Sequence, residues 1–429
     1  MLKKLVIFCI EALPEACYHM DTPNLKKEEM SMQFQFSDRI NKPDFQGEFT
    51  AVILKAAASP DLISFGGGLP NPISFPVKEM EVAVQKVLEK NGAAALQYST
   101  TEGYAPLRQF IAERYTKMGV DDVKADDIII TNGSQQALDM LSAVMLNAGD
   151  EIVVEDPTYL AALQSFHLYD PTVLPVELRS DGINCEELEK TLAAHSPKFM
   201  YIIPSFQNPT GLTYSPEVRE KAAELLKKTN VLLIEDNPYS ELRFTGNGGY
   251  SFGRYLGDQC CMLGTFSKVV APGMRIGWVC CRNEALRKKL LAYKMTMDLH
   301  TNIFCQMVLA QYLEDNDLDE HIEATKVLYK EKAEFMISCM KKYMPEGVTF
   351  TQPEGGMFMW ATMPEGLKAL DVYYAGLEKG VAVCPGDPFY ETQRGVRTMR
   401  INYSNSTDEA IEKGIRLLGE AIRECMAKL

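Results

Sequence analysis

Between residues 128 and 280 the sequence alternates short apolar runs with longer segments of helical periodicity. Strands that alternate with helices in this way form a mostly parallel sheet with helices on both faces. We therefore predict an α/β fold whose large domain contains a mostly parallel seven-stranded sheet. Ligands of such sheets bind beyond the carboxyl ends of the strands, where the polar motifs of this chain lie. The seven apolar runs are Ile128–Ile130, Ile152–Val154, Val173–Leu178, Met200–Ile203, Val231–Ile234, Met262–Leu263 and Ile276–Cys280.

The segments on either side of this alternation predict a second, smaller α/β domain, built from the C-terminal part and the N-terminal segment. Helical patterns cover Asp44–Ala58, Val77–Lys90, Tyr104–Met118, Ala324–Tyr343 and Asp408–Lys428. Strand-like runs cover Val348–Phe350, Met357–Trp360, Val381–Cys384 and Thr398–Tyr403. The predicted division is an extension of unknown structure (1–30), a segment that joins the small domain (31–75), the large domain (76–310) and the small C-terminal domain (311–429).

The overall charge disfavours two classes of partner. The 429 residues include 44 Lys and Arg against 58 Asp and Glu, which gives a formal net charge of -14. An acidic surface repels phosphate backbones and anionic lipid, so we predict neither a nucleic-acid partner nor a membrane partner. An anionic ligand then requires a local cationic pocket.

The N-terminal sequence and the cysteine content favour a cytoplasmic protein. The first ten residues are basic and then apolar, but the apolar run is short and Glu11 and Glu15 follow it, so we predict no signal peptide. Met30 and Met32 leave open an upstream start codon or a loose extension. The eleven cysteines contain no Cys-x-x-Cys pair, which suits a reducing compartment. The five histidines lack metal-ligand spacing, and we predict no metal site.

Lys268 is the first candidate for covalent chemistry. It lies between the apolar run Cys260–Leu263 and the Pro272–Gly273 break, on a loop with Phe266, Val269 and Val270 beside it. Partial desolvation there favours the neutral amine, which is a nucleophile toward an aldehyde. An isolated Ser-Lys pair is more often a solvated loop lysine, so other residues must support the assignment.

Three further motifs have both a functional and an ordinary interpretation. The turn Asn132–Gly133–Ser134 opens a helix after a strand, and its amides suit a phosphate, although an ordinary N-cap has the same pattern. Asp236 ends a buried strand, where an unpaired carboxylate is costly; it suits a cationic ligand, a helix cap or a surface pair. The glycines at 66–68 permit close approach of a ligand to the backbone, or form a flexible turn.

Taken together, the motifs resemble the fold type I pyridoxal-phosphate aminotransferases. Lys268 is followed by Arg275 at the spacing of that family's cofactor lysine. The resemblance runs from about Phe45 to the C-terminus and is strongest to the subgroup that contains kynurenine/2-aminoadipate aminotransferases. The other matching segments, all in the family's order, are Asn132–Gln136, Asp156–Tyr159, Asn208–Gly211, Asp236–Tyr239 and Arg400–Ser404.

The resemblance implies pyridoxal 5'-phosphate as cofactor and gives each candidate residue a role. Lys268 forms the Schiff base and then acts as a base, with Asp236 on the pyridine nitrogen and Tyr239 beside the ring as further catalytic residues. Arg400 binds the substrate α-carboxylate, with Asn208 and Gly68 also on the substrate. The remaining predicted cofactor contacts are Ser134, Gln135, Thr265, Ser267 and Arg275 for the phosphate, Asn208 and Tyr239 for the ring 3-oxygen, Tyr159 for stacking, and Tyr98 from a partner subunit of a homodimer.

The activity that the resemblance implies is transfer of an amino group from an L-amino acid to a 2-oxo acid such as 2-oxoglutarate. Members that act on 2-aminoadipate carry an arginine in the N-terminal helix, and the residue that aligns with it here is Ala51. We therefore expect an aromatic, branched or other neutral donor. A β-lyase and a 2-aminoadipate aminotransferase are the alternatives. A ligand-sensing transcription regulator is disfavoured, because the segment before Phe45 lacks a basic helical pattern.

Overall fold

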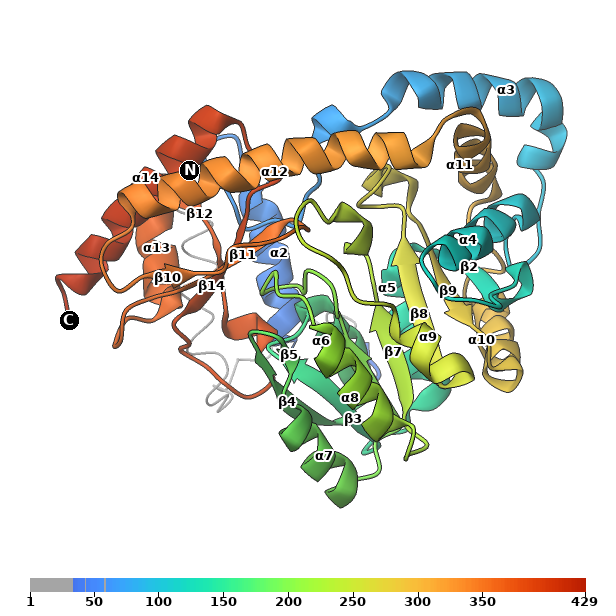
Figure 1. Cartoon of the computed structure of the whole chain (residues 1–429), viewed down its shortest axis with the longest axis horizontal. Helices are drawn as coiled ribbons and strands as arrows, with labels where there is room; N and C mark the ends of the chain where they lie inside the picture. Colours follow the sequence, from blue (N-terminus) through green and yellow to red (C-terminus); the bar gives the residue numbers. More distant parts are fainter. Residues whose placement is uncertain (1–33, 43, 58) are drawn as a thin grey trace, which may run out of the picture.

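A computed structural model describes residues 34–42, 44–57 and 59–429 of the chain. Its centre is an eight-stranded sheet, which confirms the predicted α/β class (Figure 1). The strands lie in the order β2 (Ile128–Asn132), β9 (Ile276–Cys281), β8 (Cys260–Thr265), β7 (Leu232–Asp236), β6 (Phe199–Ile202), β3 (Glu151–Asp156), β4 (Thr172–Arg179) and β5 (Gly182–Ile183).

All seven predicted strands are present, but the predicted count of seven was wrong. The eighth strand, β5, has only two residues and pairs with β4 in antiparallel register at the sheet edge. Two residues produce no apolar run, so the sequence pattern did not reveal it. Most of the sheet is parallel, as predicted, while β9 runs antiparallel to both β2 and β8.

This topology gathers functional side chains at one edge. The carboxyl ends of β2, β7 and β8 meet there, at Asn132, Asp236 and Thr265. Because β9 is antiparallel, its beginning lies at the same edge, and Arg275 immediately precedes it. Three parts of the chain that are distant in sequence, near residues 132, 236 and 265–275, are thereby brought together.

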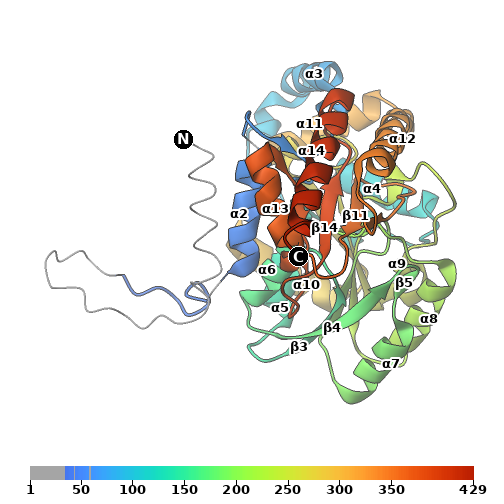
Figure 2. The same cartoon turned by 90° about the vertical axis from the view of Figure 1, so that its left-hand side faces the viewer.

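Helices cover both faces of the sheet (Figure 2). On one face α5 (Gly133–Met145) contacts β2, β8, β9 and two further helices, α6 (Leu160–His167) and α10 (Glu284–Met297). On the other face α8 (Pro216–Leu226) contacts α7 (Cys185–Ala194) and α9 (Phe252–Leu256). The sheet residues between these layers are almost completely buried, including the free thiols Cys260, Cys261, Cys280 and Cys281, as predicted.

A second sheet lies beside the first and is antiparallel throughout. Its order is β10 (Thr349–Phe350), β11 (Phe358–Thr362), β14 (Thr398–Asn402) and β13 (Cys384–Pro385). The predicted strand Val381–Cys384 is in fact two strands, because β12 (Val381–Ala382) pairs instead with β1 (Ile63–Ser64). That parallel pair ties the N-terminal segment to the C-terminal part.

Of the seven remaining helices in the described part of the chain, five correspond to predicted ranges, while those at 303–315 and 369–379 had no predicted range. The seven are α2 (Phe45–Ala57), α3 (Val77–Ala95), α4 (Ala105–Lys117), α11 (Ile303–Asp315), α12 (Leu318–Tyr343), α13 (Ala369–Lys379) and α14 (Asp408–Met426). Side-chain caps fix several helix starts: Asp317 accepts from the amides of Asp319 and Glu320, and Thr407 accepts from that of Ala410. α12 runs along both parts of the molecule, packing on α14 at one end (Figure 1).

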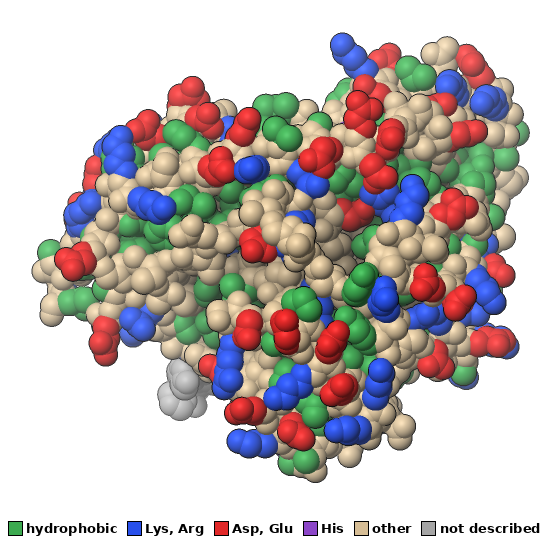
Figure 3. All heavy atoms as spheres, viewed as in Figure 1, with side chains coloured by type: hydrophobic (Ala, Val, Ile, Leu, Met, Phe, Trp, Pro, Cys, Tyr) green, Lys and Arg blue, Asp and Glu red, His purple; other side chains and the backbone are tan. Residues whose placement is uncertain are grey.

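The domain boundaries stay a prediction, and α11 contains residues on both sides of the predicted boundary at 310/311. The predicted extension at 1–30 lies outside the described residues. Among the described helices, none is sufficiently long and apolar to span a bilayer. On the face drawn in Figure 3, basic and acidic side chains are interspersed over the surface.

Candidate active site

A cavity of about 310 Å³ opens at the sheet edge where the strand ends meet. It contains every predicted site residue except Tyr98. The lining residues used below are Thr50, Ile53, Gly68, Leu69, Gly133, Ser134, Gln135, Tyr159, Leu160, Asn208, Asp236, Tyr239, Thr265, Ser267, Lys268, Arg275 and Arg400.

Lys268 follows β8 and reaches into this cavity. Its Nζ donates a hydrogen bond to the carbonyl oxygen of Gly68 at 2.7 Å. Burial, together with the positive charges of Arg400 and Arg275, lowers the pKa of Lys268 to about 8. A substantial fraction of the amine is therefore neutral near physiological pH and can attack an aldehyde carbon.

Asp236 lies at the end of β7 and is 2% exposed. Its Oδ2 accepts from the hydroxyl of Tyr201 at 2.9 Å, while the buried Oδ1 has no hydrogen-bond partner among the described residues. Burial raises the pKa of Asp236 to about 7. A cationic ring N–H donor would satisfy Oδ1 and stabilise the carboxylate, so the nitrogen of a pyridinium fits this position.

The beginning of α5 forms a cradle for an anion. Gly133 has a φ of +70°, and a Cβ at this position would lie 2.3 Å from Nη2 of Arg275, so only glycine fits. Arg275 donates to Asn132 O at 3.3 Å and to Ser267 Oγ at 3.4 Å, and Thr265 Oγ1 donates to Ser267 Oγ at 2.9 Å. Helix amides, a guanidinium and hydroxyls together suit a phosphate.

Gln135 lies in the cavity wall, but its side chain is engaged elsewhere. Its Nε2 donates to Ala161 O at 2.8 Å and to Ser165 Oγ at 2.7 Å, both on α6. Only its backbone amide is left for a phosphate contact.

Arg400, on β14, is a buried cation whose hydrogen-bond partners are uncharged. Nη1 donates to Asn208 Oδ1 at 2.7 Å, and Nη2 donates to Gly66 O at 2.6 Å. Its buried Nε has no partner among the described residues. The guanidinium also lies 4.5 Å from the ring centroid of Phe358. A carboxylate in the cavity would supply the missing negative charge.

Two tyrosines complete the cavity. Tyr239 is buried and hydrogen-bonded to Asn208, and burial raises its phenol pKa above the ordinary range. Tyr159 begins α6 and is half-buried in the cavity wall. Two phenol groups and the amide of Asn208 therefore line the same cavity as Asp236.

Tyr98 lies away from the cavity of its own chain. Its side chain is 79% exposed, and its ring meets the ring of His300 edge to face at 6.0 Å. Its predicted role in a partner's site stays a prediction.

Sequence reasoning missed Tyr201, Thr50, Ile53 and Leu160. Tyr201 lies within the uniformly buried strand β6 and looks like a core residue; only the adjacency of β6 and β7 brings its hydroxyl to Asp236. Thr50 and Ile53 reach the cavity because α2 packs against α6. No local sequence signal predicts either contact.

An amine of lowered pKa, a buried acid and an anion cradle around one cavity are the requirements of a pyridoxal-phosphate enzyme. The chain belongs to the class I and II aminotransferases, whose family model matches residues 71–418. It is a pyridoxal-phosphate-dependent transaminase. When bound, the cofactor supplies an electrophilic carbon and a ring that withdraws electrons from the substrate.

Three relatives illustrate the similarity. An aromatic-amino-acid aminotransferase from Thermococcus litoralis is 41% identical over 382 residues, which is 88% of this chain and 91% of that one. The structure of an alpha-aminoadipate aminotransferase from Thermus thermophilus, complexed with N-(5'-phosphopyridoxyl)-L-leucine, matches with a TM-score of 0.85 at 36% identity, covering 92% of this chain and 98% of that one. A kynurenine aminotransferase structure from Pyrococcus horikoshii matches with a TM-score of 0.85 at 38% identity, covering 91% and 97%.

Proposed function

We propose that this enzyme moves the amino group of an L-amino acid with a neutral, aromatic or branched side chain to a 2-oxo acid. This proposal rests on which charged residues line the cavity. Lys268, Arg275 and Arg400 are the cations among the described lining residues. Each already has a proposed ligand group: the aldehyde, the phosphate and the substrate α-carboxylate, respectively. Among the described lining residues no further cation remains for a distal carboxylate, and Ile53, Leu69 and Leu160 add apolar side chains to the cavity wall.

The proposed roles of the chain's own residues follow from these positions. Arg400 binds and orients the substrate α-carboxylate. Lys268 Nζ takes the proton from the substrate Cα and returns it, since its pKa of about 8 allows both directions near neutral pH. Asp236 keeps the ring nitrogen protonated, while Arg275, Ser267, Thr265 and the start of α5 hold the phosphate.

The experiment that tests the reaction type compares turnover with and without an acceptor. Transamination requires a 2-oxo acid in every cycle, so product from an aromatic or branched donor should stop after one turnover per site when the acceptor is omitted. A β-lyase breaks the bond between Cβ and a leaving group, so continued release of pyruvate and ammonia from a donor that carries such a group, with no acceptor present, would instead identify that activity. Parallel assays with 2-oxoglutarate and pyruvate test the acceptor. Of the two, only 2-oxoglutarate has a distal carboxylate, which would contact the apolar side chains of the cavity wall.

Replacing Ala51 with arginine should increase the preference for 2-aminoadipate. Ala51 is exposed on α2 and does not line the cavity, whereas its neighbours Thr50 and Ile53 do. An arginine there extends from the rim toward a distal carboxylate, so kcat/KM for 2-aminoadipate relative to leucine should rise by about tenfold. Ala51→Gln is the matched control, being long but uncharged. An unchanged ratio in Ala51→Arg would count against the proposed orientation of the substrate.

The proposed quaternary structure is a cytoplasmic homodimer with shared active sites. Tyr98 supports it, because this phenol is exposed beside other exposed apolar residues, including Leu96 and Leu299. Light scattering should give twice the chain mass, and Tyr98→Phe should weaken pyridoxal-phosphate binding. A monomeric active enzyme would contradict the proposal. The interspersed charges in Figure 3 give no support to the alternative of a DNA-binding regulator.

A further inference from the structure

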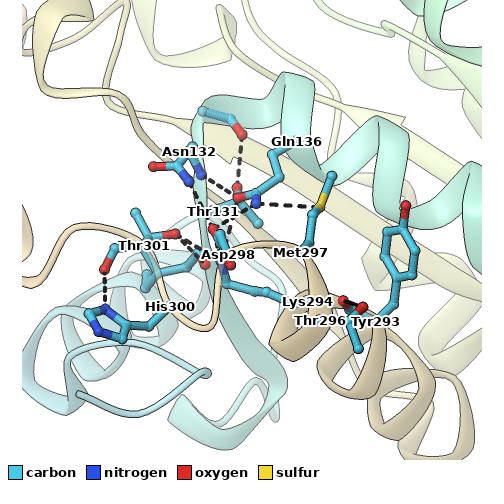
Figure 4. Close-up of polar contacts among 12 residues, drawn as sticks. Thr131, Asn132, Gln136, Tyr293, Lys294, Thr296, Met297, Asp298, His300 and Thr301 are labelled. Carbon is cyan, nitrogen blue, oxygen red and sulfur yellow. Dashed lines mark hydrogen bonds and ion pairs between the residues drawn. The ribbon is translucent and has the colours of Figure 1, made fainter. Parts of the chain in front are cut away.

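An ion pair between a buried lysine and a partly exposed aspartate lies next to Asn132 and Gln136 (Figure 4), and neither member of the pair lines the cavity. Lys294, on α10, has a side chain that is 0% exposed, and its Nζ lies 2.8 Å and 2.9 Å from the two carboxylate oxygens of Asp298. Thr301 Oγ1 accepts from the same Nζ at 3.0 Å. The Asp298 side chain is 19% exposed, so the buried charge of Lys294 is paired with a carboxylate at the boundary of the interior.

The carboxylate of Asp298 also holds the turn that leads into α5. Its Oδ2 accepts from Asn132 Nδ2 at 2.9 Å and from Gln136 Nε2 at 2.7 Å. Gln136 uses its other amide atom as well, since Oε1 accepts from the backbone N–H of Asn132 at 2.7 Å. Figure 4 shows these side chains converging on Asp298. Asn132 is therefore held at both its backbone and its side chain.

Asn132 is the last residue before the cradle. Gly133 and Ser134 follow it, and its carbonyl oxygen accepts from Arg275 Nη2 at 3.3 Å. The contacts thus run without a gap from Lys294 through Asp298 and Asn132 to the guanidinium and helix amides of the cradle. A shift of Asp298 would displace the amides that face the phosphate.

The same segment supports the loop that carries Tyr98. Thr301 Oγ1 donates to Ile130 O at 3.2 Å, on the strand that ends at Asn132. Nε2 of His300 accepts from the amide of Ser99 at 3.2 Å, next to Tyr98. Residues 294–301 therefore connect both elements that are expected to meet a phosphate group.

We propose that Lys294 and Asp298 are positioning residues for the cofactor phosphate, acting as one unit through Asn132 and Gln136. The charge balance matters as well as the geometry, because Asp298 without Lys294 would place an uncompensated negative charge behind a dianion. This inference rests on the assignment of the phosphate to the start of α5.

The test compares two ligands that differ only in the phosphate. Apoenzyme is titrated with pyridoxal phosphate and with pyridoxal, and binding is followed by the change in absorbance. Asp298→Asn and Lys294→Met should each weaken binding of pyridoxal phosphate by about tenfold or more, as loss of a charged hydrogen bond does, while pyridoxal changes by less than about twofold. The double variant should lose no more than the worse single variant, because the pair acts as a unit.

A matched control lies on the same helix. Lys288 pairs with Glu284 at the same four-residue spacing, but both side chains are exposed, so Lys288→Met should change neither affinity. If the ion-pair variants do not fold, Gln136→Met removes the bond to the backbone N–H of Asn132 and one bond to Asp298, while the ion pair and the bond from Asn132 Nδ2 to Asp298 remain. It should show a smaller loss of the same selective kind.

The proposal is overturned if folded variants lose equal affinity for both ligands, or if their affinity for pyridoxal phosphate stays within about twofold of wild type. Wild-type apoenzyme provides the separate reference in the same titration. If it showed no preference for pyridoxal phosphate over pyridoxal, the phosphate assignment itself would fail, whatever the variants do.

Discussion

Lys268→Ala should reduce kcat/KM for transamination by on the order of 10⁴-fold or more, because one side chain supplies both the nucleophile and the base. The folded state should change little, since Lys268 makes a single hydrogen bond, to Gly68 O, at the cavity wall. The assay is steady-state turnover of a neutral donor with a saturating 2-oxo acid.

Two observations separate this chemistry from a purely structural effect. Methylamine added to Lys268→Ala should restore part of the activity, because a small amine can enter the space and accept the proton. Lys268→Arg should not be active, since a guanidinium stays protonated and cannot attack a carbonyl carbon. Activity of Lys268→Ala within about tenfold of wild type would refute the assignment.

The pKa of Lys268 also predicts how pH affects cofactor uptake. Burial and two arginines lower this pKa to about 8, and only the neutral amine is nucleophilic. The rate at which apoenzyme takes up pyridoxal phosphate should therefore rise with pH and level off above about 8. An exposed lysine, with the ordinary pKa near 10, would show the rise about two pH units higher.

Asp236→Asn should lower kcat by roughly 10³-fold while preserving shape, because the variant loses the negative charge that we propose acts on the cofactor ring. The amide can still accept a hydrogen bond from Tyr201, so the local packing is retained. What disappears is the carboxylate that, in the proposed mechanism, would keep the ring nitrogen protonated.

Tyr201→Phe is the matched control for this site. It removes the 2.9 Å hydrogen bond to Oδ2 but leaves the charge, so the loss should be about tenfold. The pair of variants separates charge from hydrogen bonding. If Asp236→Asn kept kcat within a factor of about ten, the proposed role of the carboxylate would be wrong.

Site residues at the ends of strands could be predicted from the sequence. Site residues that reach their partners through packing of neighbouring elements could not. Lys268, Asp236 and Ser134 belong to motifs at strand ends, and the parallel topology places all such ends at one edge. Tyr201 looked like core, because its contact with Asp236 depends on the order of strands in the sheet. Lys294 and Asp298 were not singled out from the sequence, because their contact with Asn132 depends on how α10 packs on α5.

The differences in the fold have a similar origin. Gly182 and Ile183 form a strand only because β4 offers a free edge. The run from Val381 to Cys384 is continuous in sequence, but its beginning pairs with β1 and its end pairs with β14, in different sheets. Ala51, the residue expected to correspond to a family arginine, is exposed on α2, whereas Thr50 and Ile53 of the same helix line the cavity. Each of these outcomes depends on a partner that is distant in sequence.

The most direct measurement asks which residue binds the cofactor covalently. Enzyme saturated with pyridoxal phosphate is reduced with borohydride, digested and analysed by peptide mass spectrometry. A phosphopyridoxyl group on the peptide that contains Lys268, and its loss in Lys268→Ala, is the predicted result. A group on any other lysine, or no covalent group in protein that has bound the cofactor, would contradict the account.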